Sequence, residues 1–145
     1  MKSHSLQDYT AVLSSISSPF ISSSIDDTDS VVTQVLHTVL ESTEVQRAYI
    51  FLFSDDGQHL TLSYEVCAEG ILPHKGILES VAVADLREFV AELKSGNDIF
   101  QTISEIPQSE ETESVRSIMD RLSIASFINI PMFFGSELVG YIGFD

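Results

Sequence analysis

Two β-hairpin patterns, at residues 47–67 and 126–145, constrain the fold of this chain more than any other feature of its sequence. Each joins two apolar, β-prone runs through a turn signal, Asp56-Gly57 in the first hairpin and Gly135-Ser136 in the second. In the run RAYIFLF both alternating faces are apolar. This strand is therefore expected at the centre of a sheet that is covered on both sides.

Helical spacing of apolar residues predicts four helices, at residues 6–20, 30–42, 85–95 and 113–122. Two short strands are expected as well, at residues 77–83 and 98–103. Neighbouring strands pair as hairpins, so the sheet should be mainly antiparallel. This order predicts an α/β domain of the α+β type, with the amino-terminal helices on one face of the sheet and the crossover segments on the other.

The composition narrows the classes of partner and compartment. The 145 residues fit one domain, and 22 acidic against 7 basic residues give a net charge of −15. Because this surface repels phosphate and anionic lipid, neither nucleic acid nor membrane insertion is expected. The single cysteine, Cys67, permits no internal disulfide and fits a reducing, cytoplasmic compartment. The amino terminus has no signal-peptide pattern, and no apolar run is long enough to span a membrane.

The titratable residues do not form a catalytic or metal-binding pattern. The histidines are scattered without metal-ligand spacing, at His4, His37, His59 and His74. No nucleophile–base pair is visible, so no catalysis and no metal site are predicted. Glu65 and Glu69 flank Cys67 and oppose formation of its thiolate. Arg116 has two possible roles, as an anion ligand in a pocket or as the ion-pair partner of Asp120.

Four stretches of the sequence resemble a GAF domain of the kind found in microbial multidomain sensor histidine kinases and cyclases. They are RAYIFLFSDDGQ, YEVCAEGI, SEIP and, most specifically, SFINIPMFFGSELVGYIGFD with its proline, Gly-polar turn and LVGYIGFD ending. The resemblance covers residues 6–145. Val66 departs from it, because GAF domains of this kind have an aromatic residue at that position. It implies a six-stranded antiparallel sheet, with helices on one face that dimerise and pass on a signal. A small-molecule pocket is implied on the other face, under the crossover segments.

Alternation along the hairpins sorts their side chains into two sets. The aliphatic and small set suits packing against helices and comprises Ala48, Ile50, Leu52, Ile128, Ile130, Met132, Leu138, Gly140 and Ile142. The aromatic and polar set suits a ligand pocket and comprises Tyr49, Phe51, Phe53, Phe127, Asn129, Tyr141 and Gly143. Asn129, if buried, needs a hydrogen-bond partner. Two interpretations stay open, because these aromatic residues either contact a ligand or simply fill the space under the crossover.

The predicted function is that of a non-catalytic sensory GAF domain that binds an unidentified small molecule. It would relay the signal through its helices to an output domain in the same chain, a histidine kinase or a cyclase. The alternative is a structural dimerisation module with a filled pocket and no ligand. Bilin-binding GAF domains commonly carry Cys followed by His in the last crossover helix, and SVRSIMDRL has neither. Covalent bilin attachment is therefore not supported by the sequence.

We expect a single domain over residues 1–145, with an amino-terminal helix and linker at 1–28 and a core at 29–145. Because the chain stops directly after a strand pattern, it is expected to be a fragment of a longer signalling protein. A homodimer is expected through the amino-terminal helices, with contacts from Tyr9, Val12 and Ile16.

Overall fold

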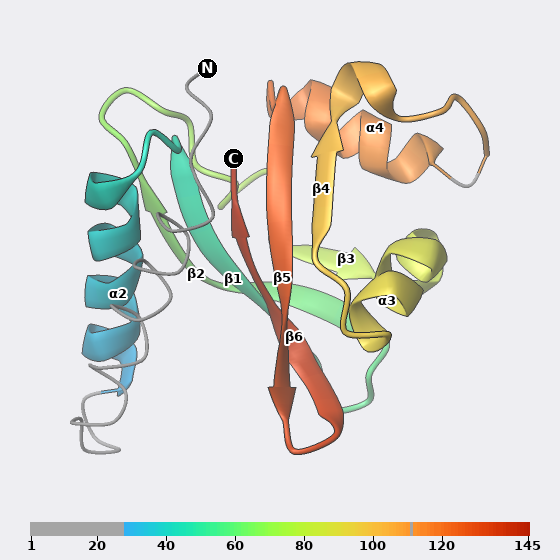
Figure 1. The fold of residues 1–145 in the computed structure, drawn as a ribbon, viewed down its shortest axis with the longest axis horizontal. Coiled ribbons are helices and arrows are strands. Elements are labelled where there is room, and N and C mark those ends of the chain that lie inside the picture. The colour runs from blue at the N-terminus through green and yellow to red at the C-terminus, as the bar shows by residue number, and fades with distance from the viewer. Residues whose placement is uncertain (1–27, 111) are drawn as a thin grey trace.

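One six-stranded antiparallel sheet forms the centre of the computed structural model, which describes residues 28–110 and 112–145 (Figure 1). The strands are β1 (Arg47–Phe53), β2 (His59–Cys67), β3 (Ser80–Ala82), β4 (Ile99–Thr102), β5 (Ser126–Phe134) and β6 (Glu137–Phe144). Their order across the sheet is β3-β2-β1-β6-β5-β4, and every neighbouring pair is antiparallel. The predicted α+β fold class is confirmed, and β1 lies in the middle of the sheet as its two apolar faces predict.

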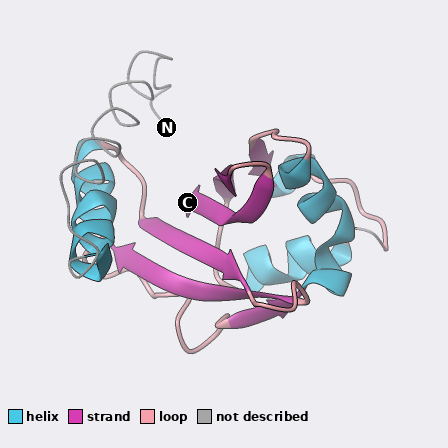
Figure 2. Ribbon diagram, turned by 90° about the horizontal axis from the view of Figure 1, so that it is seen from below, coloured by secondary structure: helices cyan, strands magenta, loops and turns pink. Residues whose placement is uncertain are grey.

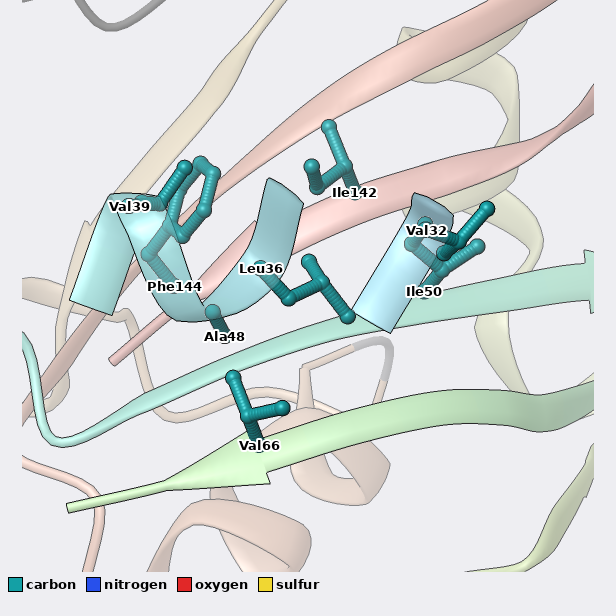
Figure 3. Close-up of a cluster of buried hydrophobic side chains, with 8 residues drawn as sticks. All are labelled: Val32, Leu36, Val39, Ala48, Ile50, Val66, Ile142 and Phe144. Atoms are coloured by element: carbon teal, nitrogen blue, oxygen red, sulfur yellow. The ribbon is translucent and has the colours of Figure 1, made fainter. Parts of the chain in front are cut away.

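Helix α2 (Thr28–Ser42) covers one face of the sheet and packs against β1 and β2 (Figures 1 and 2). Its apolar stripe, predicted from residues 30–42, meets the aliphatic face of the strands. Figure 3 shows the resulting cluster of buried side chains, Val32, Leu36, Val39, Ala48, Ile50, Val66, Ile142 and Phe144. The predicted helix at residues 6–20 and its proposed dimer contacts lie outside the described residues.

Two crossover helices cover the opposite face of the sheet (Figure 2). A short 3-10 helix (Val83–Leu86) leads into α3 (Arg87–Lys94), which buries Val90 and Leu93. After β4 and a second 3-10 turn (Ile103–Glu105), α4 (Glu113–Arg121) buries Met119. Both helices lie where the sequence predicts them. No helix in the described part of the chain is long and apolar enough to cross a membrane.

Two β-bulges change which face the side chains occupy. In β2, Tyr64 pairs with Ile50 but Leu62 pairs with Phe51, so one residue of β2 between them is extra. In β6, Gly140 pairs with Met132 and Leu138 with Phe133, which again leaves one extra residue. An extra residue moves the following side chains to the other face. The prediction that Leu138 faces the helix is therefore wrong, because it packs with the aromatic cluster on the crossover side.

Candidate functional site

A cavity lies between the sheet and the crossover helices. It offers about 50 Å³ of free space, which is room for a few water molecules. Its wall contains five of the predicted site residues, Tyr49, Phe51, Phe127, Asn129 and Tyr141. The remaining lining residues are His74 and the apolar side chains of Leu78, Val81, Leu86, Phe89, Val115, Ile118, Met119 and Ile124. The aromatic face predicted from alternation therefore borders a cavity, and the wall of this cavity is mostly apolar.

Two predicted site residues do not line this cavity. Phe53 packs at the margin of the same apolar cluster. Gly143 lies between Tyr49 and Asn129 in the sheet, paired with both. A Cβ atom at Gly143 would stand 2.3 Å from Asn129 Oδ1 and 2.3 Å from Tyr49 Cε2. The missing side chain at Gly143 therefore makes the space in which its two neighbours meet.

Asn129 has the hydrogen-bond partner that its burial requires. The Tyr49 hydroxyl donates to Asn129 Oδ1 at 3.3 Å, and each residue is 4% exposed. Burial raises the pKa of Tyr49 and that of Tyr141 above the usual tyrosine value. Both hydroxyls therefore remain protonated and act as hydrogen-bond donors at neutral pH.

A charged network that sequence analysis misses lies beside the cavity, at the ends of β1 and β6. Arg47 Nη1 donates to Asp145 Oδ1 at 2.6 Å, and these side chains are 4% and 2% exposed. The same guanidinium donates through Nε to the Leu72 carbonyl at 2.7 Å and through Nη2 to the Leu122 carbonyl at 3.1 Å. Arg47 thus joins the strand ends to two loops, with all three of its nitrogens engaged.

His74 completes this network and forms part of the cavity wall. Its Nδ1 contacts the Glu65 carboxylate, and its Nε2 lies 3.2 Å from Asp145 Oδ2. The second contact brings the charges together without hydrogen-bond geometry, since Asp145 Oδ2 has no hydrogen-bond partner among the described residues. The ring of His74 meets Tyr49 edge-on, with 4.6 Å between centroids. His74 therefore links the cavity to the ion pair of Arg47.

The two carboxylates favour a protonated His74. Burial lowers the pKa of His74, but the contacts with Asp145 and Glu65 outweigh it, so the pKa is raised. Burial raises the pKa of Glu65, but hydrogen bonds from His74 and from the Lys75 backbone lower it by more, so the pKa ends below its usual value. With the imidazolium present, two cations face two carboxylates and the network is electrically neutral.

Part of this network leaves a signal in the sequence. Arg47 directly precedes one apolar run and Asp145 directly follows another, and antiparallel pairing brings those ends together, since Ala48 pairs with Phe144. His74 gives no such signal, because it lies in a loop without periodicity.

Three other predictions concern Cys67, Arg116 and metal binding. Cys67 is half-buried, and its thiol pKa is raised by burial and then by the Glu65 carboxylate. Arg116 does not line the cavity, and its Nη1 donates to the carbonyls of Ile103 and Ile106 at 3.0 and 2.9 Å. No ion pair between Arg116 and Asp120 is found among the described residues. No group of three metal-ligating side chains occurs within residues 28–110 and 112–145.

No protein-family model and no curated protein matches this sequence. Solved structures of the same shape do exist. A phycoerythrobilin-bound GAF domain from a cyanobacterial phytochrome superposes with a TM-score of 0.72 at 17% identity, covering 95% of this chain and 81% of that one. A phycocyanobilin-bound GAF domain from a cyanobacterial phytochrome gives 0.71 at 16% identity, covering 97% and 80%. A far-red absorbing dark-state protein with bound biliverdin IXa gives 0.65 at 16% identity, covering 92% and 80%.

These comparisons correct one prediction and confirm another. The sequence-based argument against a bilin used a Cys-His pattern in one helix, and it is overturned because chains with this fold are solved with bilins bound. Identities of 16–17% carry information about the fold alone. The sheet order, the helices on both faces and these superpositions agree with the family resemblance: the chain has the fold of a GAF domain.

Proposed function

We propose that this chain is a non-catalytic sensory domain that binds a small molecule between the sheet and the helices α3 and α4. The observation that carries the proposal is the cavity itself, which is mostly apolar and contains a few fixed polar groups from Tyr49, Asn129 and Tyr141. Sites for small molecules have this composition, because apolar walls supply affinity and a few polar groups supply orientation.

The size of the ligand depends on how far the crossover helices move. A linear tetrapyrrole is one class of ligand, since the structural neighbours hold bilins in this fold. The free space of about 50 Å³ is far smaller than a tetrapyrrole, so a bilin would require α3 and α4 to move away from the sheet. A single-ring molecule requires much less rearrangement.

The central strands supply a route from the cavity to α2. In β1, Tyr49 and Phe51 face the cavity while Ala48 and Ile50 pack against α2. A ligand that binds one arrangement of the aromatic side chains more tightly would shift this strand and the helix behind it. We propose that α2 passes this shift to an output domain of the same chain, a histidine kinase or a cyclase. The alternative is the dimerisation module with a filled pocket.

Thermal unfolding with and without ligand tests the proposal. We expect biliverdin, phycocyanobilin or a member of a metabolite library to raise the melting temperature, because a ligand of the folded state stabilises it by mass action. Val115→Phe places a ring in the cavity wall and should abolish the shift. Ser117→Phe adds the same ring at an exposed position of α4 and should preserve it.

The same experiment separates the two functions. If no compound raises the melting temperature, or if Val115→Phe responds like the unchanged chain, the cavity is not a binding site and the dimerisation module is favoured. For the two bilins, a change in the visible absorption spectrum on mixing gives a second, independent measure of binding.

A further inference from the structure

The orientation of the Asn129 side chain is set by its surroundings. The absence of a side chain at Gly143 lets Tyr49 reach Asn129 across β6. Among the described residues the Tyr49 hydroxyl has no other acceptor, so its proton goes to Asn129 Oδ1. The amide nitrogen of Asn129 is then left with two N–H donors and no protein partner within the described ranges.

Tyr141 supplies a second unpartnered donor. Its ring is held by stacking on Phe51 at 5.3 Å and by the edge of Phe89 at 5.4 Å. Its hydroxyl has no hydrogen-bond partner in the part of the chain that the structure describes, and burial keeps it protonated. Asn129 and Tyr141 are 4% and 7% exposed, and both line the cavity.

Neither of these donors is sealed inside the protein. Within residues 28–110 and 112–145, only one fully buried side-chain polar atom has no hydrogen-bond partner, and it is Asp145 Oδ2. The nitrogen of Asn129 and the oxygen of Tyr141 therefore keep accessible surface, and the cavity is the space that both residues border. Buried donors left unsatisfied cost folding free energy, so an acceptor in the cavity would be stabilised there.

Among the described residues, neither cationic side chain beside this cavity, Arg47 or His74, is free to receive an anion. The three guanidinium nitrogens of Arg47 bond to Asp145, Leu72 and Leu122. Both ring nitrogens of His74 face carboxylates. With a net charge of −15 on the whole chain, an anion entering the cavity would lose its water without gaining a counter-charge.

We propose that the group bound inside this cavity is a neutral, mostly apolar ring that presents a hydrogen-bond acceptor to the Asn129 amide and the Tyr141 hydroxyl. This inference rests on the proposed function, because it specifies the chemistry of a molecule bound in the same cavity. Apolar neighbours such as Phe89 and Met119 would contact the rest of the ring.

Three single-ring probes test the inference on the full chain. Pyridazine is neutral and has two adjacent acceptor nitrogens, benzene has the same shape without an acceptor, and benzoate adds a negative charge. Titrations followed through backbone amide signals in NMR spectra give the dissociation constant of each probe. We expect Asn129→Leu and Tyr141→Phe each to weaken pyridazine binding by about tenfold while benzene binding changes little.

A matched control is Tyr64→Phe. It removes a hydroxyl on the α2 side of the sheet, where Tyr64 donates to Asp29, and should leave the affinity for pyridazine unchanged. Retained amide spectra show that each variant is folded, and the two site variants provide independent readouts of the same inference.

The outcomes distinguish the two proposals. Pyridazine binding that is unchanged in both site variants, or benzoate binding tighter than pyridazine in the unchanged chain, would overturn the inference about ligand chemistry. Benzene binding without pyridazine binding would overturn it while the cavity remains a binding site. If none of the three probes perturbs residues around the cavity, the inference about ligand chemistry is overturned, while the proposed function is decided by the thermal unfolding experiment with bilins and the metabolite library.

Discussion

At the scale of single residues, His74 connects the buried charges to the cavity wall. Its imidazolium balances the buried charges of Glu65, Asp145 and Arg47, and its ring packs against Tyr49. Because the pKa of His74 is raised in the folded state, its stabilising effect is complete below the ordinary value of 6.5 and is lost as pH rises through the folded value.

We therefore predict that His74→Gln destabilises the protein more in mildly acidic than in alkaline solution. Loss of one partner from a buried charged network costs about 3 kcal/mol. Urea unfolding near about pH 5.5 should show that loss, and the difference should shrink towards about pH 8.5, because the unchanged chain loses its own imidazolium as the pH rises through the folded pKa of His74. Glu65, whose pKa is lowered, stays ionised over this range.

His37→Gln is the matched control for this substitution. His37 is exposed on α2, so its replacement should leave the free energy of unfolding within about 0.5 kcal/mol at both pH values. An equal loss of stability by His74→Gln at both pH values would contradict a charged His74 in the network.

At the scale of elements, the hairpins and helices are predictable because each has a strong local signal. Turn residues such as Gly135 and a period of two or 3.6 residues indicate where strands and helices lie. The bulges have no comparable signal, since they depend on how β2 and β6 register with their neighbours. For that reason Leu138 is assigned to the wrong face although Gly140 and Ile142 are assigned correctly.

Arg116 fixes the 3-10 turn (Ile103–Glu105) that follows β4. Its two hydrogen bonds to Ile103 and Ile106 hold that turn against α4. We predict that Arg116→Met keeps the aliphatic part of the side chain but loses about 1–2 kcal/mol of stability. Backbone amides in residues 103–112 should exchange faster with deuterium than in the unchanged chain.

Arg121→Met provides the control in the same helix. Arg121 is exposed near the end of α4, so its loss should change neither stability nor exchange by a comparable amount. Equal effects of the two substitutions would show that charge on α4, rather than the two carbonyl bonds, holds the turn.

At the scale of the whole molecule, the sequence predicts where the cavity lies better than which charged residues border it. Five of the seven predicted residues line the cavity because strand alternation places Tyr49, Asn129 and Tyr141 on one face. To predict the network around His74, one must know how the loop at residues 68–79 folds back on the sheet. The sequence of this loop has no periodicity that indicates its path.

Association of two copies is a further property of the whole molecule that we predict. We propose a homodimer through the segments 6–20 and 30–42, of which the first lies outside the described residues. A net charge of −15 on each copy opposes association, and added salt screens this repulsion. Sedimentation velocity at tens of micromolar protein should therefore show a dimer whose share increases with salt.

Substitutions in the first segment decide this prediction. Tyr9→Glu and Ile16→Glu place charges among the proposed contacts and should give monomers, whereas Ser17→Glu adds the same charge at a polar position and should leave the dimer intact. A monomer at every salt concentration in the unchanged chain would show that its helices do not associate. Ligand-induced shifts of α2 would then have to act within one copy, since a dimer interface would not be available to transmit them.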